Sequence, residues 1–167
     1  MSERYRGVLA GAVSGILAGI IMGIVSMLVS YRTGMGLLLP LHMVAATFYG
    51  VGALVDGAGV AAIGLIIHLV VSAFFGVVFA LLTQTNIAQR GPLIRGGLVF
   101  AIVIWAIMTF LFLPAVNPTM SSRVALQPTG WFIEHIVFGV VLSFLPNIER
   151  ILFKSQRREQ LLYKRAA

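Results

Sequence analysis

Two histidines lie inside apolar segments of the sequence, and they are the residues best suited to chemistry. His68 and His135 each precede two small residues at four-residue spacing, namely Ser72 and Gly76 in one case and Gly139 and Ser143 in the other. Residues four apart share a helix face, so we expect each imidazole on the side that contacts other helices. Two imidazoles at similar depth in a membrane could be the axial ligands of a b-type haem.

Three other roles are open to the same histidines. They could form hydrogen bonds within a helix bundle, bind another metal together with Glu134, His42 or Asp56, or line a path for protons or a solute. The sequence has no Cys and no dense acidic cluster beside them, so the hydrogen-bonding role is favoured. Rings facing each other across an open gap would favour a haem or metal. A hydrogen bond from each ring to a carbonyl or hydroxyl would favour a structural role.

Glu134 is the acidic neighbour of His135, and we expect it just below the outer membrane surface. It could pair with Arg123, or stabilise the start of its helix, where a negative charge meets the positive end of the helix dipole. The sequence contains no GxSxG, P-loop or HExxH pattern that would point to catalysis. We therefore expect a protein that is not an enzyme.

The composition is that of an integral membrane protein. Of the 167 residues, 59% are apolar and only 10% are charged, whereas a soluble domain carries about 25% charged residues. Four segments are long and apolar enough to cross a bilayer, at about residues 7–30, 59–83, 96–113 and 131–148. The predicted fold is therefore all-α: residues 1–148 form a bundle of four transmembrane helices, and residues 149–167 form a basic amphipathic tail.

The basic residues set the predicted orientation. With four spans, ten Lys and Arg residues share one side and only Arg32 and Arg123 lie on the other. The positive-inside rule then places both termini in the cytoplasm, and we expect the protein in the inner membrane. Residues 37–55 are a fifth apolar stretch, but a crossing there would spoil this split. We expect them to form a short interfacial or re-entrant helix on the outer side.

The first apolar segment has a glycine at every fourth position, at Gly7, Gly11, Gly15, Gly19 and Gly23. These glycines share one helix face, and small residues let two helices approach closely in a membrane. The face could pack inside the chain, or it could dock another membrane subunit or a second copy. We expect the four small residues that follow the histidines to pack helices in the same way.

The C-terminal tail is basic. Its cationic residues are Arg150, Lys154, Arg157, Arg158, Lys164 and Arg165. Near an anionic membrane surface each basic residue contributes about 1 kcal/mol of attraction. We therefore expect the tail to contact membrane lipids, or to dock on a larger complex, and we expect no nucleic-acid partner.

The order of these features resembles a known group of proteins. A glycine-rich first span is followed by an outer segment with Pro40, a second span with H-x-x-x-S at His68, a third span that ends at Pro114, and a fourth span with Glu134 and His135. This order is similar to that of small bacterial four-span inner-membrane proteins of uncharacterised function, including the YagU-like group. The resemblance implies no activity.

The leading hypothesis for function is a non-enzymatic accessory or assembly subunit of a larger membrane complex, such as a bioenergetic one. This hypothesis rests on analogy, because small charge-poor subunits are common in such complexes. The first alternative is a redox membrane protein that binds haem or a metal at His68 and His135. The second alternative is a small channel or transporter assembled from several copies.

Overall fold

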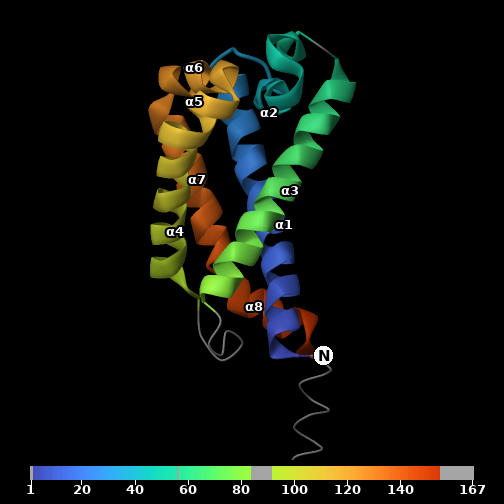
Figure 1. Ribbon diagram of the computed structural model, residues 1–167, viewed down its shortest axis with the longest axis vertical. Helices are drawn as coiled ribbons and strands as arrows, with labels where there is room; N and C mark the ends of the chain where they lie inside the picture. The colour runs from blue at the N-terminus through green and yellow to red at the C-terminus, as the bar shows by residue number, and fades with distance from the viewer. Residues whose placement is uncertain (1, 56, 84–91, 155–167) are drawn as a thin grey trace, which may run out of the picture.

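The computed structural model describes residues 2–55, 57–83 and 92–154, and every regular element within them is a helix. Three helical segments are long and apolar enough to cross a membrane. They are α1 (Glu3–Arg32), α3 (Ala58–Leu82) and α4 (Ile94–Ile107), which continues through the π-helical turn η3 (Met108–Phe112) into α5 (Leu113–Val116). The predicted all-α membrane fold is confirmed (Figure 1).

A fourth candidate span is a bent pair of helices. Helices α6 (Pro118–Leu126) and α7 (Pro128–Leu142) meet at an angle of 103°. Helix α7 ends at Leu142, whereas the sequence predicted a helix over residues 131–148. The helix stops early because Pro146 lacks an N–H and is placed at the start of a new helix, α8 (Leu145–Leu152). Helix α8 is amphipathic and lies beside α1 at the lower end of the bundle (Figure 1).

The apolar stretch over residues 37–55 does not form a span. It folds into α2 (Leu39–Tyr49) and the short 3-10 helix η1 (Gly50–Leu54). Helix α2 has only 11 residues, and a transmembrane helix needs about 17–25. Figure 1 shows α2 at the upper end of the bundle together with α6, and its Pro40, Leu41, Ala45 and Ala46 are buried against the protein.

The long helices form two closely packed pairs, α1 with α3 and α4 with α7. In the first pair, a Cβ atom added to Gly15 would collide with the Ser72 carbonyl oxygen and reach the Gly76 Cα atom. In the second pair, a Cβ atom added to Gly97 would collide with the Gly139 carbonyl oxygen. Both pairs therefore depend on the small residues that follow the two histidines.

The two pairs meet along one side only. Helix α1 packs on α7, while α3 and α4 diverge toward the upper end of the bundle (Figure 1). One buried apolar cluster, which includes Phe79, Leu142 and Leu145, fills the lower half. A second cluster joins Met120 and Val124 of α6 to Leu113 of α5.

Candidate functional site

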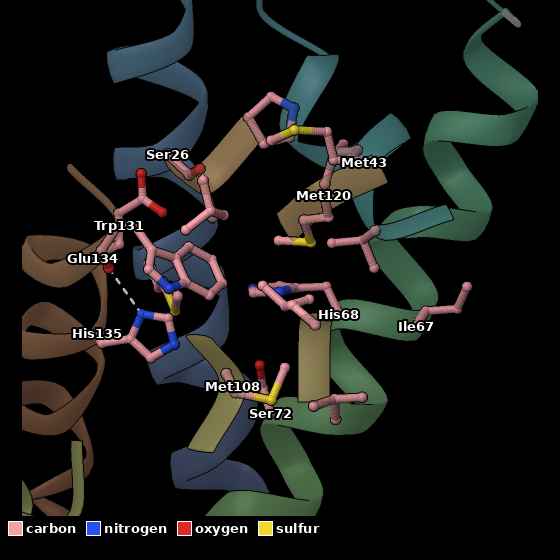
Figure 2. A pocket seen from close by; sticks show the side chains of 18 of the residues that line it. Ser26, Met43, Ile67, His68, Ser72, Met108, Met120, Trp131, Glu134 and His135 are labelled. Carbon is pink, nitrogen blue, oxygen red and sulfur yellow. Dashed lines mark hydrogen bonds between the residues drawn. The ribbon is translucent and has the colours of Figure 1, made fainter. Parts of the chain in front are cut away.

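A cavity of about 490 Å³ lies among α1, α3, α4 and α7, below α2 and α6 (Figure 2). Pockets that bind small molecules typically measure about 300–1,000 Å³. The lining is mostly apolar, and it contains five of the seven methionines in the sequence: Met22, Met35, Met43, Met108 and Met120. Methionine side chains are flexible and polarisable, so a wall rich in them can adapt to the shape of a ligand.

The cavity opens sideways rather than only at the end of the bundle. Several lining side chains are also exposed on the outer surface: Phe48 by 73%, Phe74 by 61% and Ile107 by 47%. Phe74 lies in α3 and Ile107 lies in α4, and both of these helices are long and apolar enough to cross a membrane. On this side the cavity therefore lies between two helices that could cross a membrane.

Both predicted histidines line this cavity from different helices, His68 from α3 and His135 from α7 (Figure 2). The His68 Nε2 atom lies 2.9 Å from the Gly19 carbonyl oxygen, and the His135 Nδ1 atom lies 2.9 Å from the Trp131 carbonyl oxygen. A carbonyl oxygen can only accept a hydrogen bond, so each of these nitrogens carries the hydrogen. In the neutral ring the second nitrogen then has a free lone pair.

The structure therefore combines features of the structural role and of the ligand-binding role predicted for the histidines. Each ring forms a hydrogen bond with a backbone carbonyl oxygen, and both rings border the same cavity. The free nitrogens are Nδ1 of His68 and Nε2 of His135. The Nδ1 atom is next to the ring carbon that carries the side chain, so a porphyrin approaching it would collide with the histidine's own Cβ atom. This arrangement is unsuited to a haem held by both histidines, although His135 presents the nitrogen that usually binds haem iron.

The residues suggested as additional metal ligands are not brought together. His42 lies on α2 and does not line the cavity, and Asp56 lies outside the described residues. Within the described ranges there is no group of three or more His, Cys, Asp or Glu side chains that could hold a metal ion. The cavity therefore offers two imidazoles and one carboxyl group separately, rather than a closed ligand shell.

Glu134 is buried in α7, with 6% of its surface exposed, and its carboxyl group lies beside the Ser26 side chain of α1 (Figure 2). Neither role predicted for it is found. No ion pair with Arg123 occurs in the described structure, where Arg123 is exposed and borders the same cavity. Because α7 begins at Pro128, Glu134 also lies beyond the first turn, where the helix dipole would favour a negative charge.

Trp131 is a site residue that the sequence-based reasoning did not identify. Its ring packs edge-on against His135, with 4.3 Å between the ring centroids, and its Nε1 atom donates a hydrogen bond of 2.8 Å to the Thr109 hydroxyl. Thr109 belongs to the π-helical turn η3, a rare conformation that is common near functional sites. One residue in the sequence indicates this turn. Pro114 has no backbone N–H, so the end of the same helix lacks one of its regular hydrogen bonds.

The glycine face of α1 is used within the chain. Gly11, Gly15 and Gly19 contact α3 around Ser72 and Gly76, and a Cβ atom added to Gly23 would lie 3.6 Å from His68 Nε2. Gly7 is buried near the start of α1. In the second pair Gly139 and Ser143 contact Gly97 of α4. The surface proposed for docking another subunit is therefore covered by α3 over these three central glycines.

Only part of the basic tail belongs to the described structure. Arg150 and Lys154 are exposed at the lower end of the bundle, in and just after α8. Arg157, Arg158, Lys164 and Arg165 lie outside the described residues. The expected contact of these residues with lipid stays a prediction.

Comparison with protein-family models, with curated proteins and with solved structures finds no match to this chain. The resemblance to the YagU-like group therefore stays a prediction. Function has to be inferred from the geometry of the cavity itself.

Proposed function

We propose that this multi-pass membrane protein is a non-enzymatic binding protein for a lipophilic molecule that enters the cavity from the bilayer. The observation that carries the proposal is the position of His68 and His135. Their rings line one cavity of about 490 Å³, and this cavity opens between two helices that can cross a membrane. A largely apolar cavity with a few convergent polar groups is the usual form of a small-molecule site.

The proposal is tested by filling the cavity at its opening. Val71 lines the cavity and is 40% exposed, whereas its neighbour Val70 is 63% exposed and does not line the cavity. Val71→Trp should reduce the amount of a bound lipophile, and Val70→Trp should leave it unchanged, because only the first ring occupies the cavity.

The measurement is mass spectrometry of organic extracts from protein purified in mild detergent. We expect a lipophilic species that is retained by the wild type and by Val70→Trp but depleted in Val71→Trp. Identical extracts from all three proteins, containing only bulk phospholipid in its bilayer proportions, would contradict the proposal.

The accessory-subunit hypothesis is a second, separate proposal, and it rests on the small size and charge-poor composition of the chain. Co-purification of other membrane subunits in mild detergent would support it, and a single pure species at native expression would count against it. Assembly of several copies into a channel has less support, because α3 covers the central part of the glycine face.

We also propose the inner membrane as the location, with both ends of the chain in the cytoplasm. Five of the described basic residues lie at the lower side of the bundle in Figure 1. They are Arg4 and Arg6 at the start of α1, Arg95 at the start of α4, and Arg150 and Lys154 in and just after α8. Arg32 and Arg123 belong to the upper side, where α1 ends and α6 lies. This asymmetry supports the lower side as the cytoplasmic one.

A further inference from the structure

We infer that the cavity selects lipophilic molecules whose head group carries hydrogen-bond donors, such as a phenol or a hydroquinone with an apolar tail. This inference rests on the proposed function, because it names the class of molecule that the same cavity would take. It follows from the hydrogen-bonding state of the two histidines, which the structure fixes through their backbone partners.

The first step concerns which nitrogens are free. Gly19 and Trp131 contribute carbonyl oxygens, so His68 Nε2 and His135 Nδ1 must be the donors in these two bonds. The remaining nitrogens, Nδ1 of His68 and Nε2 of His135, are acceptors in the neutral rings. Neither has a hydrogen-bond partner among the residues that the structure describes. Two unpaired acceptors on the wall of one cavity match a ligand that brings donors.

The second step concerns the other polar groups of the cavity. The Glu134 carboxyl group lies beside Ser26, and its carbonyl oxygen can accept a hydrogen bond in either protonation state (Figure 2). The hydroxyls of Ser26 and Ser72 can donate or accept, so they set no preference. The Ser30 hydroxyl donates to the Gly36 carbonyl oxygen at 2.6 Å and is therefore engaged. Arg123, a permanent donor, is exposed at the outer rim. The groups beside the two rings therefore favour a donor rather than an acceptor.

The third step concerns shape and access. Phe75, Phe138 and Trp131 border the cavity together with the methionines, and these side chains suit the faces and edges of a flat ring. The side opening at Phe74 and Ile107 would let an apolar tail extend into the bilayer. An acceptor left unpaired in such a site is costly, so a ligand that brings donors gains affinity and a ligand without donors does not.

The test compares two probes that differ in their donors. The first is 2-decylhydroquinone, kept reduced under anaerobic conditions, and the second is its dimethyl ether, which has the same ring and tail but no donor. Trp131 reports binding through its fluorescence, because it packs on His135 inside the cavity. The chain has only two tryptophans, so Trp105→Phe leaves Trp131 as the single reporter.

In the Trp105→Phe protein we expect the hydroquinone to bind at least about tenfold more tightly than the ether, a factor that one good hydrogen bond can supply. His135→Phe and His68→Phe each remove one acceptor and should reduce this preference by severalfold. His42→Phe is the matched control, since His42 lies outside the cavity, and it should keep the full preference. Thermal unfolding of each variant checks that the bundle is intact.

Each other outcome has a defined meaning. If the two probes bind equally, or the ether binds more tightly, the cavity admits lipophilic molecules but the selectivity for donors is wrong. If the preference survives both histidine substitutions, the histidines are not the acceptors and the inference is overturned. If neither probe changes the fluorescence of Trp131 at any accessible concentration, the proposed function fails together with the inference.

Discussion

Single glycines control how closely the helices approach one another, and Gly15 is the clearest case. A side chain at this position would meet backbone atoms of Ser72 and Gly76, which cannot rotate away. Forcing extra methylene groups into a packed core typically costs about 1–3 kcal/mol of stability. We expect Gly15→Leu to lower the stability by more than this, because α1 and α3 would have to separate. The melting temperature in detergent measures this effect.

Gly59→Leu is the control for the glycine prediction. Gly59 also lies in a membrane-crossing helix, but an added Cβ atom there would have nothing within 4 Å. Its substitution should leave the melting temperature nearly unchanged. Equal stability of Gly15→Leu and Gly59→Leu would mean that the close contact between α1 and α3 does not exist.

Asn117 joins three segments at the upper end of the bundle. It is 1% exposed, and its amide donates to the Met43 carbonyl oxygen at 2.9 Å and to the Thr47 hydroxyl at 2.8 Å. Its side-chain oxygen accepts from the Met120 N–H at 2.9 Å, which caps α6. A buried polar group left without a partner costs about 1–3 kcal/mol. We therefore expect Asn117→Leu to destabilise the protein by several kcal/mol.

The comparison for this substitution is Ser122→Ala. The Ser122 hydroxyl donates to the Pro118 carbonyl oxygen, but Ser122 is exposed, so water can replace the lost bond. Chemical denaturation or thermal unfolding of both variants gives the difference. A loss at Asn117 no larger than that at Ser122 would show that α2 and α6 do not depend on this residue.

Some of the residues that matter for the site and the bundle could be predicted from the sequence, and others could not. His68 and His135 are conspicuous because an ionisable residue in an apolar segment has few roles. Asn117, Met120 and Trp131 have no such signal, since asparagine before proline is usual in a turn and methionine and tryptophan are ordinary in membrane helices. Their roles depend on contacts between segments that lie far apart in the chain, such as Asn117 with Met43.

At the scale of elements, the turn η3 determines how α4 meets the cavity. Its Thr109 hydroxyl accepts the hydrogen bond from Trp131 Nε1 and so fixes the ring that packs on His135. Thr109→Val keeps the shape but removes the acceptor. In the Trp105→Phe protein we expect the emission of Trp131 to shift to shorter wavelength, and we expect a stability loss of about 1–3 kcal/mol for the unpaired donor.

Thr109→Ser is the matched variant, because it keeps a hydroxyl at the same position. It should preserve the emission wavelength of Trp131, although it removes a methyl group. Were both variants to emit like the unsubstituted protein, the bond between Trp131 and η3 would be absent in solution, and the ring would be positioned by packing alone.

The long elements were predictable because their signal is local. Residues 7–30, 59–83 and 96–113 are apolar runs without Asp, Glu, Lys or Arg, and the structure places helices over all three. The end of α7 was missed because Leu145 and Ile148 continue the apolar run past the real boundary at Leu142. Pro146 was the correct signal, since proline begins a helix more readily than it continues one.

At the scale of the whole molecule, the cavity arises from an asymmetry between two similar helix pairs. The contacts of Gly15 with Gly76 and of Gly97 with Gly139 make the pairs alike. The pairs join through α1 and α7, but α3 and α4 spread apart (Figure 1). The sequence predicts the small residues within each pair, whereas the opening between pairs depends on where α2 and α6 cap the bundle. No local pattern encodes that placement.

The last prediction concerns how the whole chain lies in the membrane. The sequence contains no cysteine, so single cysteines can be introduced without further changes. Val55 is 88% exposed near the upper end of the bundle, and Ser2 is exposed at the start of α1 at the lower end. If the lower end is cytoplasmic, a membrane-impermeant thiol reagent should label Val55→Cys in intact cells and Ser2→Cys only after the membrane is permeabilised.

Lys154→Cys, after α8, should behave like Ser2→Cys, because an even number of crossings returns the chain to the side where it began. Labelling of Lys154→Cys but not Ser2→Cys in intact cells would mean an odd number of crossings, with the segment of α2 or of α6 and α7 threaded differently. Labelling of both, with Val55→Cys protected, would keep the fold but invert the orientation and place the basic end of the molecule outside the cytoplasm.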